Sequence, residues 1–205
     1  MNLIRKFNPT QLFVDGMLGQ YSLGLTTGLI AAATSGELVQ FQWSDPSRLA
    51  AVRKIAIGAC NSTPWAAGAA VPLTFDLVLA TGWSAQGTGG TSVDVSTGTG
   101  RRRKAMPASL VPPGNIRIAT TAALGAGTKT LDTQPLATIN GNLTNGSSVM
   151  AVAPGTALFD YRQAENDYPI VLQPQDGFVI RLTSNPGTGT FFLSVSVEWA
   201  EVSAS

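Results

Sequence analysis

Residues 191–199 read Phe-Phe-Leu-Ser-Val-Ser-Val-Glu-Trp, and this stretch decides the fold class. Large apolar side chains stand at every second position, and Ser194, Ser196 and Glu198 stand between them. An alternation with a period of two is typical of a β-strand that buries one face. The sequence therefore predicts an antiparallel all-β protein in which this strand is central to the core.

A second apolar stretch, Phe178–Leu182, lies shortly before this strand. The residues that connect the two, Ser184–Gly189, are rich in turn formers. Two strand-like stretches joined by such a short segment are typical of a β-hairpin. We predict that they pair with each other in one sheet.

Further stretches with strand character follow one another along the chain, with glycine, proline and asparagine between them. They are Glu37–Trp43, Arg53–Cys60, Val71–Leu79, Ile116–Thr120, Leu136–Ile139, Val149–Val152 and Ile170–Leu172. Asn140-Gly141 and Asn145-Gly146 are typical of two-residue turns. The pattern favours an antiparallel β-sandwich of jelly-roll type, and the alternative is an irregular β-barrel.

The chain is predicted to form one sandwich domain, residues 21–205, with an extended N-terminal arm at residues 1–20. The arm has no clean periodicity, and Asn8-Pro9 favours extended backbone that directs the chain outward. Its apolar residues do not fit the alternation of a strand, and we expect them to bind a neighbouring subunit. They are Leu12, Phe13, Val14, Met17 and Leu18.

Composition points to a protein that other chains cover. Charged residues make up only 12% of the chain, whereas a soluble domain usually has about 25%. The net charge of +1 argues against a specific nucleic-acid binder, which usually has a basic field. We expect a homo-oligomer, with a trimer as the expected closed form. The uncharged stretch 16–36 holds too many glycines and hydroxyls for a membrane span, so no membrane contact is predicted.

One group of residues concentrates positive charge. Arg101, Arg102, Arg103 and Lys104 follow a segment rich in glycine, serine and threonine. Such a cluster is typical of a contact with an acidic partner. The alternative interpretation is a solubilising loop.

Catalytic and metal-binding patterns are scarce. The chain has no histidine, which excludes Ser-His-Asp and Cys-His arrangements and the usual zinc sites. The single cysteine, Cys60, follows an apolar run and is expected to be buried. Asp160, Glu165 and Asp167 are close in sequence, and we interpret them as a solvated loop in preference to a Ca²⁺ site. We predict no enzymatic activity and no cofactor.

Several stretches resemble a group of small virion proteins of tailed bacteriophages and prophages, over roughly residues 30–202 with gaps. They are Glu37–Trp43, Gly82–Ala85, Met106–Leu110, Ala119–Pro135, Pro169–Leu172, Gly177–Leu182 and Val197–Glu201. The resemblance implies a structural part of the virion, made in the bacterial host cytoplasm. A capsid decoration or cement protein that clamps neighbouring subunits is the expected role, and a tail, collar or baseplate protein is the alternative. Its partners would be the major capsid protein or tail components.

A second class of function stays open from the sequence. A β-sandwich can bind host glycans by stacking a sugar ring on an exposed aromatic side chain. Trp65 and Trp83 are the candidates for that platform.

Overall fold

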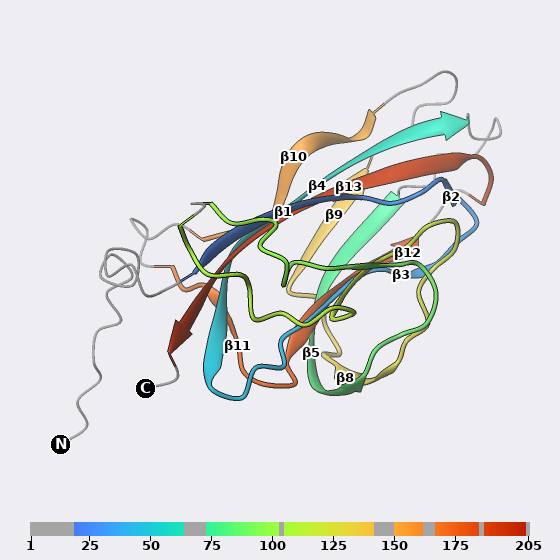
Figure 1. Cartoon of the computed structure of the whole chain (residues 1–205). Coiled ribbons are helices and arrows are strands. Elements are labelled where there is room, and N and C mark those ends of the chain that lie inside the picture. The colour runs from blue at the N-terminus through green and yellow to red at the C-terminus, as the bar shows by residue number, and fades with distance from the viewer. Residues whose placement is uncertain are drawn as a thin grey trace.

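The computed structural model describes residues 19–63, 73–102, 105–141, 150–161, 167–184 and 187–203. Two antiparallel sheets pack face to face and enclose one core (Figure 1). No helix in these ranges is long and apolar enough to cross a membrane.

Sheet A contains the two longest strands, which lie side by side at its centre (Figure 1). Its strand order is β1-β13-β4-β10, with β2 beside β13 and β11 beside β4. The bounds are β1 Gln20–Thr26, β2 Ile30–Ala31, β4 Arg48–Thr63, β10 Met150–Asp160, β11 Ile170–Leu172 and β13 Thr190–Ser203.

Sheet B forms the second layer. Its strand order is β6-β7-β3-β12-β5-β8, with β9 also beside β5. The bounds are β3 Gly36–Gln42, β5 Leu73–Ala85, β6 Thr91–Val93, β7 Ile116–Ile118, β8 Thr128–Leu131, β9 Ala137–Gly141 and β12 Gly177–Ser184.

The strands pair from the two ends of the chain inward. β1 pairs with β13, β3 with β12, β4 with β10, and β5 with β8 and β9, all antiparallel. In addition, β13 pairs with β4 and β12 pairs with β5, which joins these nested pairs into two sheets. This arrangement is a jelly roll. The prediction of an antiparallel β-sandwich of jelly-roll type is confirmed.

The predicted hairpin between residues 178–182 and 191–199 is wrong. β12 lies in sheet B between β3 and β5, whereas β13 lies in sheet A between β1 and β4. The chain crosses from one sheet to the other between β12 and β13, so the core-facing side chains of these two strands meet across the core. Phe178, Val179 and Ile180 are all fully buried, as expected for a central strand covered on both faces.

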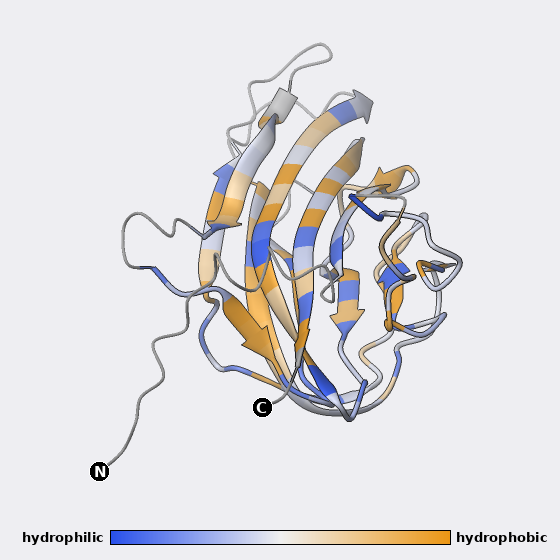
Figure 2. Ribbon diagram, turned by 60° about the vertical axis from the view of Figure 1, so that its left-hand side comes forward, coloured by the Kyte–Doolittle hydropathy of each residue, from blue (hydrophilic) through white to orange (hydrophobic). Residues whose placement is uncertain are grey.

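The alternation in β13 is confirmed. Phe191, Leu193, Val195, Val197 and Trp199 are each no more than 2% exposed and belong to the main core. Along the long strands, hydrophobic and hydrophilic residues form alternating bands (Figure 2).

Aromatic rings join the two sheets across the core. Phe41 in β3 stacks on Phe178 in β12 with ring centroids 5.0 Å apart, and it forms an edge-to-face pair with Trp199 of β13, with ring centroids 5.4 Å apart. Tyr21 in β1 stacks on the same Trp199 at 5.3 Å. Such pairs add about 0.5–1.5 kcal/mol each beyond the apolar area that they bury.

Two local predictions from the sequence are wrong. Asn140 and Gly141 do not form a turn, because β9 continues through them and pairs with Thr74 and Leu73 of β5. Cys60 is exposed, because its neighbour Ala59 takes the core-facing position of β4. Asn145-Gly146, the second predicted turn, lies outside the described residues.

Gln175 is a position where the backbone is strained. It has a φ of 70°. Its backbone N–H donates to Trp43 O, and its C=O accepts from Trp83 N, each at 2.8 Å. Left-handed backbone costs a non-glycine residue about 1 kcal/mol or more. Because the Gln175 side chain is exposed, Gln175→Gly should raise the free energy of unfolding by about 0.5–1 kcal/mol.

Urea denaturation measures this change. The control is Gln173→Gly, since Gln173 is exposed in the same turn and is not among the residues with positive φ. That variant should lose stability. Equal effects of the two substitutions would contradict the assignment of strain to Gln175.

Candidate interaction surface

The outer face of sheet B is covered by the chain's own loops. Gln40, which is fully buried, donates from Nε2 to Gly125 O at 2.8 Å and accepts from Gly87 N at 3.2 Å. Gln42 Nε2 donates to Trp83 O at 2.5 Å. The loops after β5 and before β8 are therefore fastened to the sheet, and this face offers little surface to a partner.

Lys129 holds this cover in place. Its side chain is 2% exposed, and its Nζ lies 2.8 Å from Glu37 Oε2, also donates to Ala126 O, and stands 4.5 Å from the centroid of the Trp83 ring. Gln40 Nε2 donates to the same Glu37 oxygen at 2.6 Å. The ammonium is thus paired with a carboxylate and a ring face where water is excluded, which a buried charge requires.

The outer face of sheet A has no such layer of fastened loops among the described residues, but Pro154 in the irregular part of β10 lies against it at Gly58. Its cross-strand rows follow from the strand register. One row is Gly24, Ser196, Ala56 and Ala157, and the next is Thr26, Ser194 and Gly58. These side chains are small and uncharged, so they leave a flat sheet face.

A row of charged residues borders this flat area at one end. Across the strands the register places Ser22 beside Glu198, Glu198 beside Lys54, and Lys54 beside Asp160. Arg102 reaches over from the edge of β1, with its guanidinium 2.5 Å from Glu198 Oε2. The charges therefore alternate along the row as plus, minus, plus and minus.

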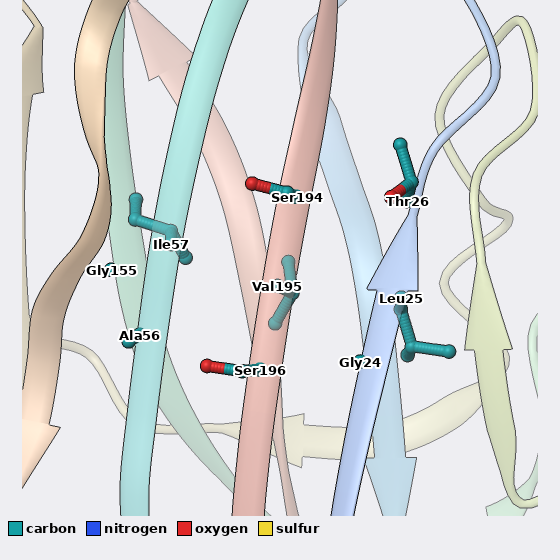
Figure 3. A pocket seen from close by; sticks show the side chains of 9 residues that line it. All are labelled: Gly24, Leu25, Thr26, Ala56, Ile57, Gly155, Ser194, Val195 and Ser196. Carbon is teal, nitrogen blue, oxygen red and sulfur yellow. The ribbon is translucent and has the colours of Figure 1, made fainter.

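A shallow recess of about 310 Å³ lies on the flat area, open to solvent (Figure 3). Gly24 and Gly155 line it, and a Cβ built on either residue would meet nothing within 4 Å. The hydroxyls of Ser194 and Ser196 stand on one side of β13 beside it (Figure 3). The recess exists because side chains are missing there, and it carries hydroxyls but no charge.

The free edge of β1 is protected by another part of the chain. Ser22 N donates to Gly100 O at 2.7 Å, and Arg102 N donates to Gln20 O at 3.1 Å. The Arg101 side chain donates to Gly98 O and Met106 O, both at 2.8 Å. These bonds cover the Gln20–Ser22 end of the edge, where they prevent strand addition by another protein.

Glu201 holds Ser109 and Leu110, which follow the segment that covers the edge of β1. It is fully buried and accepts hydrogen bonds from Ser109 Oγ at 2.6 Å and from Leu110 N at 3.0 Å. Burial raises the pKa of the Glu201 carboxyl above its ordinary value of 4.5, and hydrogen bonds from Ser109, Leu110 and Trp199 partly offset this shift.

This shift predicts a pH dependence of stability. Because the folded pKa is raised, the folded state holds the Glu201 proton more tightly than the unfolded chain does. The resulting stability is fully present below pH 4.5 and is lost as pH rises through the folded pKa. Glu201→Gln removes this titration, so the free energy of unfolding of the natural chain should fall relative to the variant as pH rises from 4.5. Urea denaturation at several pH values measures this, and parallel pH curves would contradict it.

The predicted partner-binding residues lie partly within the described structure. Arg101 is tied to backbone carbonyls of its own loop, and Arg102 forms the ion pair with Glu198 on the outer face of sheet A. Arg103 and Lys104 lie outside the described residues, as do Leu12, Phe13, Val14, Met17 and Leu18 of the arm.

Trp83 is not an exposed platform for a sugar ring. Its side chain is fully buried, and its indole N–H donates to Ala85 O at 3.1 Å. The expectation that it could stack on a glycan is therefore wrong, and Trp65 lies outside the described residues. In the described part of the acidic stretch, no group of three carboxylates, histidines or cysteines could hold a metal ion, and Glu165 lies outside it.

Sequence reasoning missed the residues that fasten the loops, Glu37, Lys129 and Glu201. Nothing local marks them, because their partners are distant in sequence. The flat face did leave a signal, since Ser194 and Ser196 alternate with the core residues of β13. Comparison with family models, curated proteins and solved structures found no match for this chain.

Proposed function

We propose that the protein is a structural component of a tailed-phage virion, and within it a capsid decoration or cement protein that clamps neighbouring subunits. In this role it acts by contact with itself and with the major capsid protein or tail components, and it needs no catalysis and no cofactor. Its place would be the virion, after synthesis in the bacterial host cytoplasm.

The outer face of sheet A, over which no loop of the described residues is fastened, carries the proposal. A sheet face whose central rows hold only glycine, alanine, serine and threonine is unusual on a protein surrounded by water, and it suits a protein that other subunits cover. The low overall charge of the chain supports the same role. Jelly rolls occur in viral capsid proteins but also in lectins, so the fold alone does not choose between these classes.

Analysis of purified particles tests the proposal. Particles of the phage or prophage that encodes the chain are purified on a density gradient, and their proteins are identified by mass spectrometry. The chain should be present at a fixed ratio to the major capsid protein. Cryo-electron microscopy then distinguishes a capsid position from the tail, collar or baseplate. A chain found only in the soluble lysate, or one that binds a glycan array, would overturn the proposal.

The N-terminal arm is expected to hold the protein in its particle. Gly19 O accepts from Glu201 N at 3.0 Å, and β1 begins at Gln20, so the sandwich requires the chain from residue 19 onward. Deleting residues 2–18 should therefore leave a folded sandwich that no longer enters particles. The control deletes residues 2–11 and keeps Leu12–Leu18. Equal incorporation of the full chain and the longer deletion would contradict a role of the arm.

A further inference from the structure

We infer that the outer face of sheet A binds the same face of a second copy of this chain, around a twofold axis that runs along the strands between β13 and β4. This inference deepens the proposed function and rests on it for its place in a particle. It concerns a contact that the purified protein makes by itself.

The outer faces of sheet A and sheet B differ in how far the chain's own loops cover them. The chain covers the outer face of sheet B with its own loops, fastened by Gln40 and by the buried Lys129–Glu37 pair. On sheet A, the described loops are fastened along the edge of β1 at Gln20 and Ser22. The central rows of the remaining face consist of glycine, alanine, serine and threonine, which allow a second sheet to approach closely.

The charged row determines which partner and which axis fit. Lys54 and Asp160 have no side-chain ion pair or hydrogen bond in the described part of the chain, whereas Glu198 is paired with Arg102. A twofold axis between β13 and β4 reverses the order of the strands, so Glu198 faces Lys54 of the second copy and Asp160 faces Ser22. An axis on β13 or on β4 would place Glu198 or Lys54 against its own equivalent, which like charges disfavour.

Shape supports the same axis. A Cβ built on Gly58 would lie 2.8 Å from the Cα of Pro154, so the irregular part of β10 lies over the outer face at Gly58. The recess extends from Gly24 and Thr26 on β1, across β13 and Ala56 of β4, to Gly155 on β10. Because the axis places β1 of one copy opposite β10 of the other, each Pro154 projection faces the β1 end of the recess of the partner copy.

The area of the face indicates a weak contact. Four strands of about seven residues cover roughly 19 Å by 24 Å. This area is at the small end of specific interfaces, so we expect a dissociation constant of the order of micromolar. An isologous contact also predicts an even number of copies, unlike the trimer expected from the sequence.

Sedimentation equilibrium of the purified full chain, from about 1 to 100 μM, tests the inference. The average mass should rise from 21.2 kDa toward twice that value. Gly24→Arg should abolish this rise, and its own fold tolerates the change because the built Cβ meets nothing. Thr130→Arg is the matched control, since Thr130 is exposed on β8 of sheet B, and it should self-associate as the natural chain does.

Charge reversal tests the axis. Lys54→Glu and Glu198→Lys should each weaken the dimer about tenfold or more, and the double variant should restore it. Circular dichroism checks that each variant is folded. A monomer at the highest concentration, a trimer, or a dimer unaffected by both Gly24→Arg and charge reversal would overturn the inference. A monomer that is nevertheless present in purified particles would overturn the pairing and leave the proposed function standing.

Discussion

Replacing Val195 with Asp is expected to abolish soluble folding. Val195 is 2% exposed and lies in β13, which pairs with β1 on one side and β4 on the other. An unpaired carboxylate at this point of the core costs several kcal/mol. That cost is comparable with the whole stability of a domain, about 5–15 kcal/mol. The variant should appear in the insoluble fraction, or melt far below the natural chain in a thermal scan.

Ser196→Asp is the matched control. It introduces the same carboxylate at the next residue of β13. The side chain of Ser196 lies on the opposite, outer side of the strand and is partly exposed. This variant should remain soluble with a melting temperature close to that of the natural chain. If Val195→Asp also melted unchanged, the core face of β13 would be wrongly assigned.

Replacing Lys129 with Met is expected to be the most damaging change outside the main core. It leaves the Glu37 carboxylate buried at 8% exposure, with Gln40 as its remaining hydrogen-bond donor. Breaking a buried ion pair from one side costs about 3–5 kcal/mol. The loops over sheet B should loosen first, so the intrinsic fluorescence of Trp83 should change before the unfolding of the whole domain.

A double variant separates the charge from the packing. In Glu37→Gln/Lys129→Met both charges are absent, so most of the lost stability should return, because a neutral pair needs no compensation. Urea denaturation of the two single variants and the double variant gives the coupling between the residues. A loss below about 1 kcal/mol for Lys129→Met would mean that the pair behaves like one at the surface.

A comparison of Val195 with Lys129 shows which buried residues can be predicted from the sequence. The burial of Val195 could be predicted, because the alternation of β13 is a local property of nine consecutive residues. The burial of Lys129 could not, because a lysine in a segment rich in glycine and threonine looks solvated. Its partner Glu37 is 92 residues away, and only the fold brings them together.

The same distinction explains the wrong hairpin. Residues 178–182 and 191–199 are both strands, as their apolar patterns predict. Their patterns say which faces are buried but not which strand lies beside which. A short connection rich in glycine and proline can lead to a neighbour in the same sheet or across to the other sheet. In this protein the connection leads across to the other sheet, because β13 pairs with β1 and β4. The residues of those two strands are far away in the chain.

Thus the sequence by itself determined the fold class, the core face of β13 and a surface with few charges, since these depend on residue type and on a period of two. The tertiary structure decided the partners of each strand, the burial of Trp83, Glu201 and Lys129, and the exposure of Cys60. It also aligned Glu198, Lys54 and Asp160 in one row on the outer face of sheet A. The physical reason is that strand register and loop cover arise from contacts between distant residues, which no local pattern records.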